Sequence, residues 1–133
     1  MLAEYTARRG HAGQTEESTG DDYVHHLERV VALVDGNVAK TVAWLHDLLE
    51  DTTYTAHDLV NLGFDQTVVA SVIRLTRVPE RTTYAQYIAQ LKASGDPVAL
   101  AVKLADLRDH LRPNCPARLR PRYEAALAVL TAP

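Results

Sequence analysis

The chain has 133 residues, of which 47% are hydrophobic and 23% are charged, and its formal net charge is −3. These values fit one globular domain over residues 1–133, and the lack of a basic excess argues against a nucleic acid polymer as partner. The single cysteine, Cys115, excludes an internal disulfide and is typical of a reducing cytosol. No apolar run is long enough to span a bilayer and no signal peptide is recognisable, so we expect a cytoplasmic protein without a membrane partner.

Hydrophobic residues recur with a helical period over most of the chain, and no segment alternates as a strand does. We therefore expect an all-α fold. The predicted helices cover approximately residues 2–11, 22–34, 37–51, 55–63, 65–77, 83–93 and 96–112, followed by one that ends near residue 130. The polar stretch GQTEESTGDD, residues 13–22, is predicted to be a loop.

The segment AWLHDLLEDT, residues 43–52, places four ionisable side chains, His46, Asp47, Glu50 and Asp51, within an apolar run. On a continuous helix over residues 37–51 these four share one side. An imidazole beside a carboxylate is a usual mixed donor set for a divalent ion. Glu50 and Asp51, one turn later, can hold a water or act as acid and base.

The other residues of that helix help to distinguish a metal-binding site from a solvated helix face. Its other side carries apolar residues, namely Val38, Val42, Trp44, Leu45, Leu48 and Leu49. Ala39 and Ala43 lie among the charged residues, and their small side chains are expected to leave open space there. The alternative is a solvated helix face, but such a face usually mixes both charges, and Lys40 is the only cation here.

The helix over residues 96–112 carries a second polar group. Its four leucines at positions 100, 104, 107 and 111 form a stripe that we expect in the core. Lys103, Asp106 and His110 fall together on an adjacent face. Asp106 is expected to be only partly wet, and a partly buried carboxylate needs a cation or donors. The alternative is a Lys103–Asp106 ion pair at the surface, which would contribute little.

The segment YVHHLERV, residues 23–30, adds a histidine. His26 borders the apolar stripe of its helix, whereas His25 points the opposite way together with Arg29. His26 is therefore the better candidate ligand, although a histidine beside an apolar face is often only structural.

Together, His26, His46, Asp47 and Asp106 offer two imidazoles and two carboxylates. With open positions, this set suits Mn, Fe, Co, Ni or Mg better than a closed structural zinc site. Such an ion can lower the pKa of bound water and provide a hydroxide nucleophile. Lys103 and Arg112 are candidates for neutralising phosphate charge.

The ordered pattern H…HD…D resembles the HD superfamily of metal-dependent phosphohydrolases. The segments ARRGHAGQ, YVHHLERV, AWLHDLLEDT, LTRVPERTTYAQYI and VKLADL resemble, in this order, blocks of the RelA/SpoT-type alarmone hydrolases and their small stand-alone relatives. The resemblance implies a helical bundle with a central divalent metal, Mn first and Mg, Fe, Co, Ni or Zn as alternatives. It implies metal ligation by His26, His46, Asp47 and Asp106, with Glu50 and Asp51 serving the hydrolysis.

In that branch the substrate is a guanosine nucleotide with pyrophosphate on its ribose 3′ oxygen, and the reaction releases the pyrophosphate. Two features depart from the pattern. The stretch TEESTGDDY is acidic where the family is basic, and His110 stands where the family has an asparagine that helps to bind nucleotide. His110 is therefore a candidate substrate-binding residue, or an additional proton donor or ligand.

The sequence thus predicts a metal-dependent phosphohydrolase acting on a phosphorylated nucleotide, with removal of the 3′-pyrophosphate of (p)ppGpp as the specific form. One alternative is a module that binds metal and nucleotide with little or no turnover. Another is a helical interaction protein with a decayed site. The sequence leaves a homo-oligomer open.

Overall fold

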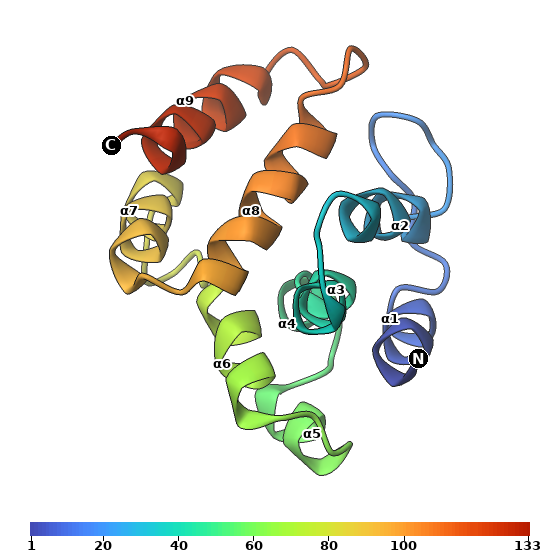
Figure 1. Cartoon of the computed structure of the whole chain (residues 1–133). Coiled ribbons are helices and arrows are strands. Elements are labelled where there is room, and N and C mark those ends of the chain that lie inside the picture. Colours follow the sequence, from blue (N-terminus) through green and yellow to red (C-terminus); the bar gives the residue numbers. More distant parts are fainter.

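The computed structural model describes residues 1–133 and contains nine helices and no strand, which confirms the all-α prediction (Figure 1). The helices, in chain order, are α1 (Leu2–Gly10), α2 (Val24–Ala32), α3 (Asn37–Leu45), α4 (Leu48–Asp51), α5 (Ala56–Asn61), α6 (Gln66–Arg74), α7 (Tyr84–Ser94), α8 (Pro97–His110) and α9 (Arg120–Thr131). No helix combines the length and the apolar character that a membrane crossing needs.

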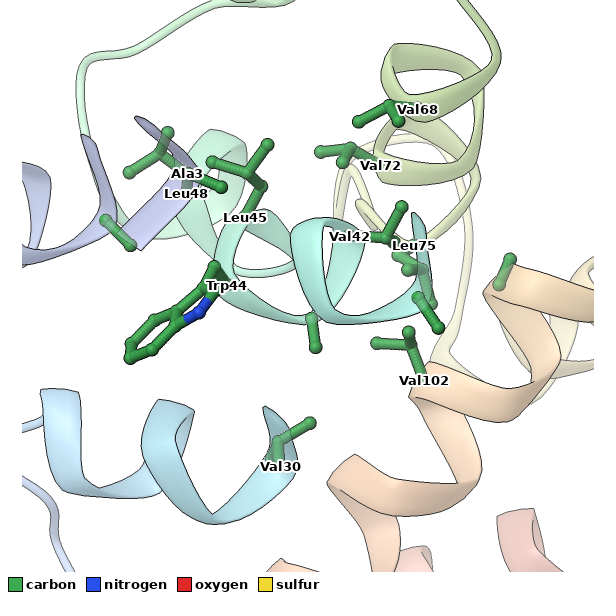
Figure 2. Close-up of a cluster of buried hydrophobic side chains, with 14 of the residues drawn as sticks. Ala3, Val30, Val42, Trp44, Leu45, Leu48, Val68, Val72, Leu75 and Val102 are labelled. Carbon is green, nitrogen blue, oxygen red and sulfur yellow. The ribbon is translucent and has the colours of Figure 1, made fainter. Parts of the chain in front are cut away.

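Helix α3 lies at the centre of the main core and contacts α1, α2, α6 and α8 (Figure 1). Figure 2 shows side chains of α6 and α8 around Val42 of this helix. A smaller cluster, Tyr87, Ile88, Leu107 and Ala126, joins α7, α8 and α9. Because α3 has neighbours on several sides, Ala39 and Ala43 are buried in the core instead of bordering open space as predicted.

Several helix boundaries follow from side-chain caps that can be recognised in the sequence. Thr55 and Thr83 each form a capping box at the start of α5 and α7. Asp96 accepts hydrogen bonds from two backbone N–H groups of α8, whose first residue is Pro97. Gly95 ends α7 in the left-handed conformation, with φ of 65°.

The predicted continuous helix over residues 37–51 is wrong, because α3 ends at Leu45 and α4 begins at Leu48. The N–H of His46 bonds to the carbonyl of Ala43, three residues earlier, and Asp47 has φ of −104° and ψ of 0°. The side chains of adjacent residues on a helix point about 100° apart. In this turn the ligand atoms of His46 and Asp47 lie close together. Neither glycine nor proline marks the break, so periodicity alone could not find it.

Helix α8 buries a different face from the leucine stripe that the sequence suggested. Of the four leucines only Leu107 is fully buried. The face that is buried carries small and polar residues, namely Ala99, Val102, Lys103, Ala105, Asp106 and Asp109. Asp106 is 2% exposed, so it is fully buried and not partly wet as expected.

Helix α1 approaches the short helix α4 closely at Gly10. A Cβ atom on Gly10 would lie 2.5 Å from Cδ1 of Leu48 and 3.4 Å from the Tyr54 ring. Leu48 is the first residue of α4 and is fully buried. The lack of a side chain at position 10 therefore permits the contact between the first helix and the helix that carries Glu50 and Asp51.

Candidate metal centre

Four side chains from α2, the α3–α4 turn and α8 converge at one point. His26, His46, Asp47 and Asp106 each offer one ligand atom, and these atoms lie within 4.8 Å of one another. The Nε2 atoms of His26 and His46 are 3.0 and 3.2 Å from Oδ1 of Asp106. Oδ2 of Asp47 is 3.1 Å from Nε2 of His46 and 3.8 Å from Nε2 of His26. The structure thus brings together all four side chains that the sequence selected as candidate ligands.

The opposite edge of each ring fixes where its proton sits. Nδ1 of His46 is 2.7 Å from the backbone carbonyl oxygen of Ala43, and Nδ1 of His26 is 2.7 Å from Oδ2 of Asp109. Both partners are acceptors, so both Nδ1 atoms carry hydrogen. A neutral ring then directs the lone pair of Nε2 at the Asp106 carboxylate, and this contact repels unless a proton or a cation lies between. The donor set therefore fits a divalent cation.

The pKa values of His26 and His46 also show that the cluster favours positive charge. Burial opposes a charge on His26, but hydrogen bonds to Asp106 and Asp109 outweigh it and raise the pKa of His26 to about 9. Burial also opposes a charge on His46, yet the charges of Asp47 and Asp106 raise its pKa well above the ordinary value. A divalent cation would satisfy both carboxylates in place of these ring protons.

Asp106 also has a cationic partner outside the ligand cluster. Nζ of Lys103 is 2.9 Å from Oδ2 of Asp106, and Lys103 is 8% exposed. The pair is therefore buried, which excludes the surface ion pair considered as an alternative. Removing one partner of a buried pair is costly because the remaining charge stays desolvated.

The ligand cluster opens into a cleft of about 260 Å³. Asp47, Glu50, Asp51 and Asp106 line it, and so do three cationic side chains, Arg77, Lys103 and Arg122. The charged ends of these cations lie 5.8, 5.6 and 5.0 Å from the centre of the Tyr84 ring. One cleft thus exposes the two carboxylates of the ligand cluster beside three positive charges.

Glu50 and Asp51 border the cleft at the end of α4. Glu50 accepts a hydrogen bond from the backbone N–H of Arg77, which ties α4 to the segment after α6. Burial, together with the charges of Asp47 and Glu50, raises the pKa of Asp51 to about 6. A carboxyl group with this pKa exchanges protons near neutral pH, as a general base or acid must.

Of the other two predicted substrate contacts, His110 and Arg112, only His110 lies at the cleft. His110 lines the cleft, and its ring lies between those of His26 and Tyr123, with centroid distances of 4.6 and 4.8 Å. Arg112 does not line the cleft, and its guanidinium lies 3.6 Å from Oδ1 of Asp109. Arg77 and Arg122 occupy the cationic positions instead.

Sequence reasoning missed several neighbours of the site. Tyr23 donates its hydroxyl hydrogen to Asp47, and Asp109 holds His26. Asp109 follows Asp106 by three residues, so helical spacing alone could have placed it on the same face. Arg29 was expected to point away with His25, but its guanidinium bonds to Asp109. Arg77 lies in the segment LTRVPERTTYAQYI but was not singled out there, and Arg122 had no local signal, because only tertiary packing brings them to the cleft.

Comparison with solved structures relates this arrangement to a known protein. The structure superimposes on a metazoan ortholog of SpoT that hydrolyses ppGpp and plays a role in starvation responses, with a TM-score of 0.82 and 22% sequence identity. The match covers 98% of this chain and 82% of the other. This chain has the HD-type helical fold. The resemblance inferred from the sequence is thus confirmed for the fold, and the four clustered side chains occur within that HD-type fold. No model of a protein family and no curated protein matches the sequence.

Proposed function

We propose that residues 1–133 form one HD-type phosphohydrolase domain that acts on a phosphorylated nucleotide with the help of a divalent metal. The observation that carries the proposal is that one cleft is lined by two members of the ligand cluster, Asp47 and Asp106, and by three cations, Arg77, Lys103 and Arg122. A phosphate group needs positive charge on its oxygens and an activated nucleophile at phosphorus. Both can be supplied within this cleft.

In this proposal His26, His46, Asp47 and Asp106 hold the cation, Mn being the first expectation. The bound ion would supply Lewis acidity that makes water a better nucleophile. The buried Lys103 belongs to the same cleft, so it can bind phosphate oxygen while it remains close to Asp106. Arg77 and Arg122 are further candidates for binding phosphate oxygens, and they replace Arg112 in this role.

Glu50 and Asp51 are proposed to move the protons of the hydrolysis. The oxygen of a water molecule attacks phosphorus, and a carboxylate of this pair takes the released proton. The bond between phosphorus and the leaving ester oxygen breaks, and that oxygen receives a proton. The raised pKa of Asp51, about 6, suits the exchange of a proton in both directions.

For the substrate, we propose a guanosine nucleotide that carries pyrophosphate on its 3′ oxygen. The likeness in fold to a protein that hydrolyses ppGpp supports this substrate. Three cations in one cleft also suit a polyanionic group better than a single phosphate ester. His110, which lines the cleft and stacks on Tyr123, is proposed to contact the nucleotide.

The deciding experiment is a screen of phosphorylated nucleotides, including ppGpp, pppGpp and nucleoside 3′-monophosphates, with the whole chain and Mn²⁺. We expect pyrophosphate release from the guanosine 3′-pyrophosphates and none from the Asp47→Ala variant. Phosphate release from other nucleotides would retain the phosphohydrolase and change the substrate.

A second candidate, a module that binds metal and nucleotide without turnover, is favoured by the acidic stretch at residues 15–22. Glu16 and Glu17 of that stretch are already paired with Arg29 and Arg118. Stoichiometric Mn²⁺ and nucleotide binding without any product in the screen would select this candidate and reject the hydrolase.

A further inference from the structure

A chain of charged side chains, buried except for the half-buried Arg29, leads away from the metal centre on the far side of His26. Oδ2 of Asp109 is 2.7 Å from Nδ1 of His26. The guanidinium of Arg29 donates to both oxygens of Asp109, with Nε 2.7 Å from Oδ1 and Nη2 3.1 Å from Oδ2. Nη2 of Arg29 also donates to Glu16. We call Asp109, Arg29 and Glu16 the Asp109 relay.

The two carboxylates of the relay are enclosed, and Arg29 between them is half-buried, so their charges interact strongly. His26, Asp109 and Glu16 are 1%, 7% and 8% exposed. Bidentate pairing with an arginine fixes the plane of a carboxylate as well as its position. The orientation of the Asp109 carboxylate is therefore set by Arg29, and the ring of His26 is set by Asp109.

The relay ends in the loop between α1 and α2. Glu16 is fixed there by its own backbone, since its N–H bonds to the carbonyl of Asp21 and its carbonyl accepts from Gly20. The Thr19 hydroxyl donates to its side chain over 3.2 Å. This acidic loop residue is thus in place to hold Arg29 and is not a free surface charge.

Glu16, His26 and Asp109 also offer donor atoms within 4.8 Å of one another, which raises the question of a second metal. The guanidinium of Arg29 already bonds to both carboxylates of this group. A divalent cation would face that positive charge at short range. The group is therefore a support for His26 and not a second metal site.

We propose that the Asp109 relay positions His26 for metal binding, so that a loop residue, Glu16, tunes the metal affinity of the centre. Asp109 keeps hydrogen on Nδ1, which leaves Nε2 free to bind the ion, and its negative charge makes Nε2 a stronger donor. Arg29 and Glu16 hold Asp109 in that orientation. The inference rests on the proposed metal centre.

The test measures Mn²⁺ affinity by calorimetry on the metal-free whole chain and its variants. Asp109→Asn keeps the size of the side chain and removes its charge, and we expect about 10- to 100-fold weaker binding. Glu16→Gln should give a smaller loss in the same direction. Glu17→Gln is the matched control, because it removes the same charge from the next residue, whose partner is the exposed Arg118, and should change nothing.

A spectroscopic signature separates positioning from mere stabilisation. With Co²⁺ as the probe, Asp109→Asn should shift the visible absorption of the bound ion, whereas Glu17→Gln should not. Should Asp109→Asn fail to fold, the same two measurements on Glu16→Gln, whose substitution lies in the loop, test the inference in its place.

One result overturns the inference and leaves the proposed function standing. In that result the wild-type protein binds Mn²⁺ and hydrolyses substrate, and Asp109→Asn and Glu16→Gln change neither the affinity nor the spectrum. Wild-type protein that binds no Mn²⁺ overturns the metal centre itself, and the inference with it.

Discussion

The two halves of the candidate centre are built in different ways. One half, the local arm, consists of His46, Asp47, Glu50 and Asp51, which lie within six consecutive residues of the sequence. The other, the assembled arm, consists of His26, Asp106 and Asp109, which α2 and α8 bring together from distant positions. The ring of His46 is held by a backbone carbonyl three residues earlier, and that of His26 by a carboxylate 83 residues later.

This difference teaches where each half is vulnerable. A backbone acceptor is present whatever side chain its residue carries, so substitution cannot easily remove the support of His46. The support of His26 is a side chain that depends on two further side chains. We therefore expect damage to the local arm to act mainly on chemistry, and damage to the assembled arm to act on metal affinity and stability.

The largest effect is expected at Asp47, which lies beside both histidine rings. It belongs to the local arm, but as a ligand it should affect metal binding as well as chemistry. Asp47→Ala should abolish detectable Mn²⁺ binding and hydrolysis together, while circular dichroism and the cooperative unfolding transition are retained. Asp47 is one of only two carboxylates in the donor set, so its removal takes away half of the negative charge that the ligands offer to the ion. Turnover that persists in this variant contradicts the assignment of the ligands.

Next in size is the proton-transfer group of the local arm. Asp51→Asn should lower kcat by about 10²- to 10⁴-fold without weakening Mn²⁺ binding. Because the pKa of Asp51 is raised to about 6, the carboxyl is protonated below that pH, and wild-type activity should rise through pH 6 and then level off. Rates measured from pH 5 to 8 test this, since the rise should vanish in Asp51→Asn. A rise of equal size in the variant would assign it to another group.

Damage to the assembled arm should lower the free energy of unfolding even in the metal-free protein. Asp106→Ala leaves the charge of Lys103 buried without its partner, which should lower the free energy of unfolding by about 3–5 kcal/mol. Urea unfolding of the metal-free protein measures the loss. The double variant with Lys103→Met is the control and should regain part of it, because the orphaned charge is then gone. An equal loss in the single and double variants would show that the ion pair is not the cause.

The smallest effect is expected for a substitution that tests the backbone support of His46. Ala43→Gly keeps the carbonyl that accepts from Nδ1 of His46, so Mn²⁺ affinity should be unchanged. Glycine within α3 should still lower the free energy of unfolding, by about 0.5–1 kcal/mol from the backbone and by about 0.8 kcal/mol from the loss of the buried methyl group. Calorimetry and urea unfolding on the same sample separate the two quantities. Weaker metal binding here would mean that the local arm, too, depends on packing.

The residues of the local arm could be selected from the sequence because their signal is short. His46, Asp47, Glu50 and Asp51 could be selected from one segment, although the turn that brings His46 and Asp47 together has no sequence mark. The caps at Thr55, Thr83 and Asp96 were equally predictable, since each depends on residues within three positions.

The assembled arm could be predicted only in part, because tertiary packing creates it. Asp106 and His26 were selected by helical position and by resemblance, but the burial of Asp106 was underestimated. Arg29 was misplaced because a long side chain can reach around its helix, which a wheel does not represent. Arg77 and Arg122 become neighbours of the cleft only when α6, α8 and α9 have packed.

Gly10 gives the centre a remote point of adjustment. Any side chain there would lie too close to Cδ1 of Leu48, so this buried side chain would have to move at the start of the short helix that ends in Glu50 and Asp51. A displacement that reached the end of this helix would move the proton-transfer pair relative to the three cations, although no group that touches a reactant had changed. A mutation outside the cleft could in this way retune the reaction rate while metal binding stays intact.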